Sequence, residues 1–213
     1  MFTRNLTRLG YDFIDDLDVN LTIQDIGDRF GGIYRVPGMA LIQTLTPRSK
    51  AEPPNTYSGL FGYGEFPFHT DLAHWHRPPR YLVMRCVTPD ESVSTRLVPA
   101  TSVLPEHHAD AAQRALFKPR RRLDQKSYFL RVSEPSLSRW DSIFIEPANK
   151  VAMELKFDIE ARLSLFAFES VVFSRAGQVL IIDNWSILHG RSPVSHPSQG
   201  RAIERVYLNT VSI

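Results

Sequence analysis

Two histidines and one aspartate could together bind a metal ion. His69 and Asp71 lie two residues apart in the segment GYGEFPFHTD, and His189 lies far downstream, after the apolar run QVLIID. On an extended strand, residues two apart point to the same face, so His69 and Asp71 could coordinate one ion. A histidine and an aspartate at this spacing also occur by chance, and His189 alone is compatible with a buried core histidine. The three residues therefore predict a metal site only as a set.

Two imidazoles and one carboxylate form a facial triad, which leaves open positions on Fe(II) for a chelating cosubstrate and dioxygen. The hydroxyl of Thr95 and the guanidinium of Arg201 suit a carboxylate at the far end of a dicarboxylate cosubstrate. Arg205 lies four residues past Arg201 and shares its face if both lie on one strand, where it could meet a second anion. Each arginine taken alone is also compatible with a surface ion pair.

The elements that must position these residues are short. Apolar or alternating runs predict strands at residues 38–45, 81–87, 127–132, 142–146, 178–183 and 205–211. Helix formers predict helices at residues 105–117 and 159–170. Because Gly or Pro separates short strands and helices are few, the pattern predicts a mainly β sandwich or barrel-like assembly rather than a doubly wound parallel sheet.

Composition limits the class of protein. The chain has 213 residues, of which 43% are hydrophobic and 23% charged, so we expect one domain over residues 1–213. The net charge of +2 gives little reason to expect nucleic acid as a partner. The single cysteine, Cys86, excludes an internal disulfide and a CxxC site, which is typical of a reducing compartment. With no signal-peptide pattern and no apolar run of membrane-spanning length, we expect a cytoplasmic protein without a membrane partner.

Three further features leave alternatives open. Residues 47–58, PRSKAEPPNTYS, have no apolar pattern and predict a surface loop, which could be a mobile lid or an inert connection. The run KPRRR at residues 118–122 could bind phosphate or nucleic acid, but a solvated basic turn is the simpler interpretation because no aromatic platform accompanies it. Five aromatic residues near the predicted ligands are candidates for pocket walls and equally for the core: Tyr63, Phe66, Phe68, Trp75 and Trp185.

The sequence resembles the Fe(II)/2-oxoglutarate-dependent dioxygenases of the taurine dioxygenase and clavaminate synthase-like (TauD/TfdA) group. The resemblance lies in GYGEFPFHTD at 62–71, PPRYLVMRC at 78–86, STRLV at 94–98, DNWSILHGRSPV at 183–194 and RAIERVYLN at 201–209. It implies that His69, Asp71 and His189 hold iron and that Thr95 and Arg201 bind the distal carboxylate of 2-oxoglutarate. It also implies a double-stranded β-helix, a cupin-like jelly roll with a few peripheral helices. Arg205 matches a position near the substrate or cosubstrate.

The resemblance implies an oxygenase that hydroxylates or otherwise oxidises an unactivated C–H bond of a small, anionic or amino-acid-like metabolite, releasing succinate and CO2. Related halogenases replace the carboxylate ligand by a small residue, so Asp71 favours hydroxylation. Two alternatives remain: the same chemistry on a protein- or carrier-tethered substrate, and a noncatalytic cupin-like binding module. A homo-oligomer is compatible with the sequence.

Overall fold

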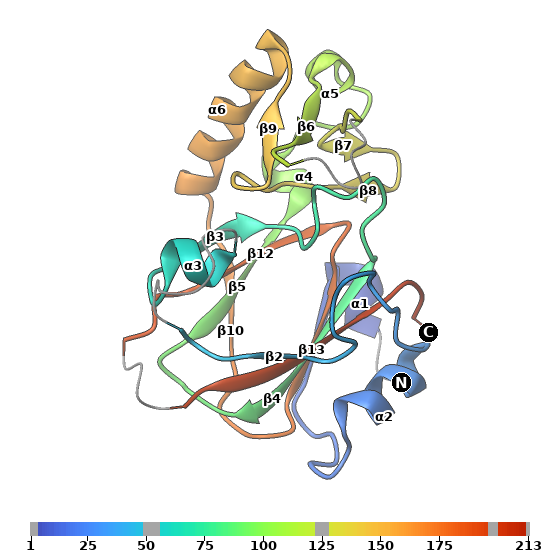
Figure 1. Cartoon of the computed structure of the whole chain (residues 1–213), viewed down its shortest axis with the longest axis vertical. Coiled ribbons are helices and arrows are strands. Elements are labelled where there is room, and N and C mark those ends of the chain that lie inside the picture. The colour runs from blue at the N-terminus through green and yellow to red at the C-terminus, as the bar shows by residue number, and fades with distance from the viewer. Residues whose placement is uncertain (1–3, 49–55, 122–127, 196–199, 212–213) are drawn as a thin grey trace.

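Two antiparallel sheets form the centre of the molecule (Figure 1). The computed structural model describes residues 4–48, 56–121, 128–195 and 200–211. The larger sheet has the strand order β1-β11-β4-β13-β2. Its strands are β1 (Tyr11–Ile14), β2 (Gln43–Leu45), β4 (Tyr81–Thr88), β11 (Val179–Asp183) and β13 (Ala202–Leu208). The smaller sheet has the order β10-β5-β12-β3. Its strands are β3 (Phe66–His69), β5 (Ser94–Pro99), β10 (Glu169–Val172) and β12 (Ile187–Arg191).

Both faces of the larger sheet are buried. On β4, Leu82 and Met84 point into a core between the two sheets, whereas Tyr81 and Val83 pack on the other face. Two helices, α1 (Arg4–Leu9) and α2 (Ile23–Phe30), contribute to that second core (Figure 1). Burial of both faces explains why β4 and β11 are almost continuously apolar.

A third core lies at one end of the sheets, beneath the longest helix (Figure 1). This helix, α6 (Lys150–Leu165), packs near two small antiparallel pairs, β6 (Phe117–Pro119) with β9 (Ile145–Pro147) and β7 (Ser133–Glu134) with β8 (Leu137–Ser138). The remaining helices are short: α3 (Tyr57–Phe61), α4 (Ala100–Val103) and α5 (Asp110–Arg114). No helix among the described residues is both long and apolar enough to cross a membrane.

The predicted mainly β assembly of short strands is confirmed, as are the strands at 81–87 and 178–183, which are β4 and β11. The run 205–211 is displaced, since β13 ends at Leu208. Runs 38–45 and 142–146 overlap β2 and β9 only at their ends. Of the run 127–132, residue 127 lies outside the described residues and Leu130 makes one bridge to Phe117. That run is apolar because Leu130 and Val132 fill the core beneath α6.

Both helix predictions are wrong in extent. Helix α6 begins at Lys150, because the side chain of Asn149 accepts the backbone N–H of Ala152 at 2.9 Å and caps the first turn. The last two residues of the second predicted helix, 169 and 170, instead belong to β10 at the edge of the smaller sheet. Within the segment 105–117, only the short α5 is helical, and Phe117 already begins β6.

Candidate metal centre and its cavity

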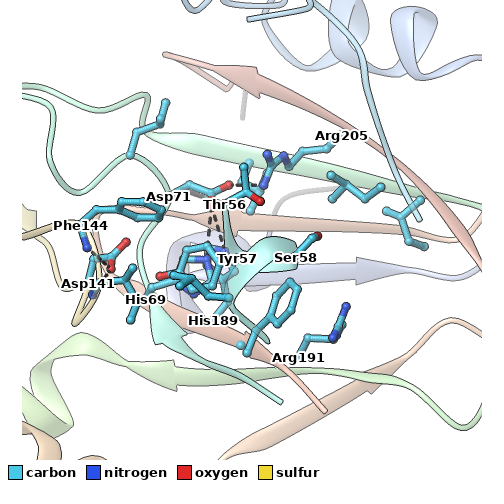
Figure 2. A pocket seen from close by; sticks show the side chains of 18 of the residues that line it. Thr56, Tyr57, Ser58, His69, Asp71, Asp141, Phe144, His189, Arg191 and Arg205 are labelled. Carbon is cyan, nitrogen blue, oxygen red and sulfur yellow. Dashed lines mark hydrogen bonds and ion pairs between the residues drawn. The ribbon is translucent and has the colours of Figure 1, made fainter. Parts of the chain in front are cut away.

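A cavity of about 760 Å³ lies between the two sheets. Its wall includes Leu82 and Ile203 from the larger sheet and Thr95 and Gly190 from the smaller one. Part of the lining is drawn in Figure 2. All six site residues predicted from the sequence line this one cavity: His69, Asp71, Thr95, His189, Arg201 and Arg205.

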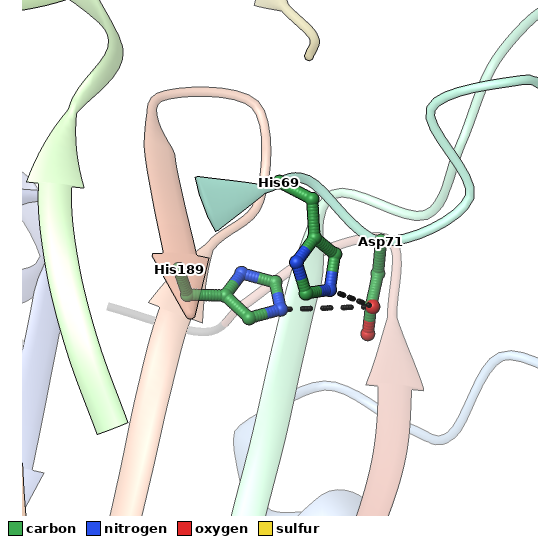
Figure 3. A group of neighbouring side chains, drawn as sticks. All are labelled: His69, Asp71 and His189. Carbon is green, nitrogen blue, oxygen red and sulfur yellow. Dashed lines mark ion pairs between the residues drawn. The ribbon is translucent and has the colours of Figure 1, made fainter. Parts of the chain in front are cut away.

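The two histidines and the aspartate converge at the cavity wall (Figure 3). His69 is the last residue of β3 and pairs directly with His189 of β12 across the antiparallel ladder. The Nε2 atoms of His69 and His189 lie 3.5 and 3.6 Å from the same oxygen of Asp71, Oδ1. One donor atom from each residue falls within 4.8 Å of the other two, and all three residues are buried. The predicted metal ligands therefore form one compact set.

The reason for this convergence differs from the prediction. His69 and Asp71 do not share an extended strand, because β3 ends at His69 and the chain turns at Asp71. Leu72 follows with a φ of 57°, a left-handed conformation that is uncommon for leucine. The turn is held by Asn184, whose side chain accepts the backbone N–H of Asp71 at 2.7 Å and donates to its carbonyl oxygen at 3.0 Å. The two hydrogen bonds from Asn184, and not the alternation of side chains along a strand, therefore hold Asp71 beside His69.

The hydrogen bonds of His69 and Asp71 leave one atom of each residue, Nε2 and Oδ1, available to bind a metal ion. The Nδ1 atom of His69 lies 2.8 Å from the carbonyl oxygen of Pro67, so an Nδ1–H can donate there and leave a lone pair on Nε2. The second oxygen of Asp71, Oδ2, accepts from Arg205 Nη1 and from the hydroxyl of Tyr207, both at 2.9 Å. His69 and Asp71 are therefore each oriented by neighbours on the side away from the shared centre, whereas Nδ1 of His189 has no hydrogen-bond partner among the described residues.

The charges within the set shift its pKa values. Burial alone would raise the pKa of Asp71, but Arg205 and the histidines hold it well below its ordinary value. Burial would lower the pKa of His69, yet the hydrogen bond and charge of Asp71 outweigh burial and raise it. The pKa of His189 is lowered, first by burial and then by the charge of His69. The ionised aspartate is thus the stable form that a metal ligand requires.

Thr95 of β5 and Arg201, the residue before β13, line one wall of the cavity. Arg201 is 7% exposed, and among the described residues its Nε has no hydrogen-bond partner. Burial lowers its pKa. A buried guanidinium with an unsatisfied N–H is costly unless a ligand supplies an acceptor, so this wall suits a carboxylate. Arg205 instead contacts Asp71 and Gln43, and its role toward a cosubstrate stays a prediction.

Three residues that sequence reasoning missed also line the cavity: Tyr57, Asp141 and Phe144 (Figure 2). The ring of Tyr57 stacks on His69 with centroids 4.1 Å apart and an interplanar angle of 23°. Asp141 is 2% exposed and its Oδ1 accepts the backbone N–H of Phe144 at 2.9 Å. Burial raises the pKa of both Tyr57 and Asp141. Neither Tyr57 nor Asp141 belongs to a local sequence motif that could have identified it as a site residue.

The loop predicted at 47–58 contributes both of its described ends to the cavity, from Pro47 and Arg48 to Thr56 and Tyr57. Its C-terminal end is helical, because Thr56 caps α3 by accepting the N–H of Gly59 at 3.0 Å. Residues 49–55 lie outside the described residues, and whether the segment is a lid stays a prediction.

Of the five aromatic residues predicted as pocket walls, Phe66 lines the cavity. Trp75 packs with the core between the sheets, and Phe68 packs against the core beneath α6. Trp185 donates its indole N–H to the carbonyl oxygen of Pro78 at 3.0 Å. Tyr63 is not part of the lining, and its carbonyl oxygen accepts the N–H of Val194. The core interpretation is thus correct for Phe68 and Trp75.

Neither a protein-family model nor a curated protein sequence matches this chain. Several solved structures, by contrast, match its fold. The non-haem iron oxygenase OrfP, in complex with Fe and alpha-ketoglutaric acid, matches with a TM-score of 0.72 and 18% identity over 97% of this chain and 77% of that chain. PvcB, an Fe, alpha-ketoglutarate dependent oxygenase from an isonitrile synthetic pathway, matches with a TM-score of 0.66 and 17% identity over 98% of this chain and 81% of that chain.

Asparagine oxygenase, in complex with Fe(II), 3-hydroxyasparagine and succinate, matches with a TM-score of 0.60 and 19% identity over 79% of this chain. The chain spans little more than half of that protein, 56% of its length. At these identities the likeness establishes the fold. The predicted double-stranded β-helix is confirmed, and the His-Asp-His set lies within it.

Proposed function

We propose that this chain is an Fe(II)- and 2-oxoglutarate-dependent oxygenase that hydroxylates a C–H bond of a small, anionic or amino-acid-like substrate. The observation that carries the proposal is the buried set of His69, Asp71 and His189, with one donor atom of each within 4.8 Å of the others. Two imidazoles and one carboxylate with open positions beside them are the ligand set of non-haem Fe(II) oxygenases. The fold shared with such oxygenases supports the same assignment.

The residues present fit the metal and the cosubstrate. Nε2 of each histidine and Oδ1 of Asp71 would hold Fe(II), because these three atoms face one another. The buried guanidinium of Arg201 and the hydroxyl of Thr95 would bind the distal carboxylate of 2-oxoglutarate. When bound, iron supplies the oxidation chemistry, in which dioxygen, 2-oxoglutarate and a substrate C–H group yield the alcohol, succinate and CO2.

The chain's own side chains orient the ligands and restrict water. Arg205 and Tyr207 hold Oδ2 of Asp71, which leaves Oδ1 directed toward the histidines. Tyr57 stacks on His69 and covers one side of the site with an aromatic surface. Asp141 offers a carboxylate to an amino group, and the cavity arginines offer partners to a carboxylate, which supports an amino-acid-like substrate. OrfP and asparagine oxygenase were each solved with a hydroxylated amino acid.

The test is anaerobic addition of Fe(II) and 2-oxoglutarate to the metal-free protein. We expect a weak visible metal-to-ligand charge-transfer band, followed by succinate release once air and substrate are supplied. Asp71→Ala should lose both signals. The matched control is Asp183→Ala, because Asp183 is also buried but pairs with Arg80 and does not line the cavity. A folded wild-type protein that binds neither Fe(II) nor 2-oxoglutarate would instead support a noncatalytic binding module.

A further inference from the structure

The basic run at residues 118–121 ends at the mouth of the candidate catalytic cavity. Arg120 and Arg121 line the cavity, whereas Lys118 does not, although it belongs to the same run. Lys118 and both arginines are exposed to solvent. The two arginines therefore stand where a ligand entering from solvent would meet them. The interpretation of the run as a solvated turn does not explain why two of its members face the cavity.

This turn is attached directly to the residues near the metal ligands. Strand β6 pairs with β9, and the backbone N–H of Arg120 donates to the carbonyl oxygen of Phe144 at 2.9 Å. The N–H of Phe144 in turn donates to Asp141, whose charge acts on His69. Because these contacts are consecutive, the position of Arg120 is fixed relative to the inner cavity.

Among the described residues, several basic side chains gather at this mouth. Glu146 lies 3.2 Å from Lys118 and 3.9 Å from Arg120, so a single carboxylate serves two cations. Arg121 adds a further cation, and Arg48 lines the same cavity from the end of the segment after β2. Guanidinium groups at a cavity mouth bind carboxylate or phosphate in a bidentate geometry and attract anions from solution.

We propose that Arg120 and Arg121 form an anion subsite for the substrate, which therefore carries a phosphate or carboxylate group remote from the carbon that is oxidised. This inference rests on the proposed function, because it assigns a substrate to that cavity. Arg120 and Arg121 follow β6, whereas Thr95 lies in β5 and Arg201 precedes β13, so we expect the subsite to bind a substrate anion while the cosubstrate occupies the wall of Arg201 and Thr95.

The test uses the full chain loaded anaerobically with Fe(II) and 2-oxoglutarate, so that the Arg201 wall is occupied. Inorganic phosphate and acetate are titrated separately by calorimetry into the wild type, the double variant Arg120→Gln/Arg121→Gln, and the control Lys118→Gln. We expect the wild type to bind at least one anion and the double variant to bind it about tenfold more weakly. Lys118→Gln should stay within about twofold of the wild type, because Lys118 contacts Glu146 but not the cavity.

Tighter binding of phosphate would assign a phosphorylated substrate, and tighter binding of acetate a carboxylate. The inference is overturned if the loaded wild type binds neither anion, if the double variant binds as the wild type does, or if Lys118→Gln loses as much affinity as the double variant. The charge-transfer band reports separately on the proposed function. A double variant that keeps the band but loses the anion supports the subsite, whereas a wild type without the band refutes the proposed function.

Discussion

Replacing Arg205 by methionine should destabilise the metal-free protein far more than the metal-loaded one. Arg205 Nη1 lies 2.9 Å from Asp71 Oδ2, and the exposed fractions of the two side chains are 18% and 9%. Methionine is similar in length and apolar, so it fills the space but leaves the carboxylate without its cation. In the loaded protein, a divalent ion beside Oδ1 supplies the missing positive charge.

The size of the effect follows from the contact. At an effective dielectric constant of about 20, unit charges at this separation attract by about 6 kcal/mol, part of which offsets the cost of burying both groups. Removing one partner of a buried pair costs about 3–5 kcal/mol, and the hydroxyl of Tyr207 still donates to Oδ2. We therefore expect a loss of about 3 kcal/mol, or about 6–12 °C in Tm for a chain of this length.

The assay is thermal and urea unfolding of the wild type, Arg205→Met and Arg205→Lys, each with and without Mn(II) as a redox-silent substitute for Fe(II). Arg205→Lys keeps the charge and should lose less than half as much stability as Arg205→Met. With Mn(II) bound, the difference between Arg205→Met and the wild type should fall to about 1.5 kcal/mol or less.

Two results would refute this reasoning. If Arg205→Met loses less than about 1 kcal/mol without metal, the ion pair with Asp71 contributes little. If Arg205→Met loses the same stability with and without Mn(II), the metal ion does not replace the positive charge of Arg205 beside Asp71. The assignment of Oδ1 as the metal-binding oxygen is then wrong.

Three further predictions concern the same site. Arg201→Gln should weaken 2-oxoglutarate binding about tenfold or more and Mn(II) binding less than about twofold, measured by calorimetry; equal losses would remove Arg201 from the cosubstrate wall. Asn184→Ala should cost about 3 kcal/mol and weaken Mn(II) binding, because Asp71 loses the hydrogen bonds that hold its backbone; unchanged metal affinity would contradict this positioning role. Metal affinity should rise as pH increases through the pKa of His69, which is raised above its ordinary 6.5, because the proton must leave Nε2 first. Mn(II) titrations between about pH 6 and about pH 8 test this sign, and an affinity that falls with pH would oppose it.

Strand prediction succeeded where local composition reflects burial on both sides. β4 and β11 are almost fully apolar because α1 and α2 cover the outer face of their sheet. It failed where apolar residues serve another core, as at Leu130 and Val132 beneath α6. Helix α6 was misplaced because Met153 and Phe157 are exposed, so its apolar residues do not mark one buried face.

Residue types, together with the family resemblance, were enough to select the candidate metal ligands and the two candidates for the cosubstrate wall, which the structure brings to one cavity. His69, Asp71, His189, Thr95 and Arg201 have side chains whose chemistry is informative without coordinates, and all of them line one cavity. This works because few combinations of side chains can bind a metal ion and a dicarboxylate together, so the residue types themselves restrict the function.

Only the tertiary structure decided what surrounds those ligands. Asn184 reaches Asp71 across 113 residues, and Arg205 and Tyr207 reach it across 134 and 136. Asp141 enters the same cavity from a segment without a local motif. Such contacts arise from the antiparallel pairing of distant strands and from the turn after His69, and the energy of a buried polar contact depends on which groups meet. No local sequence pattern predicts these long-range contacts.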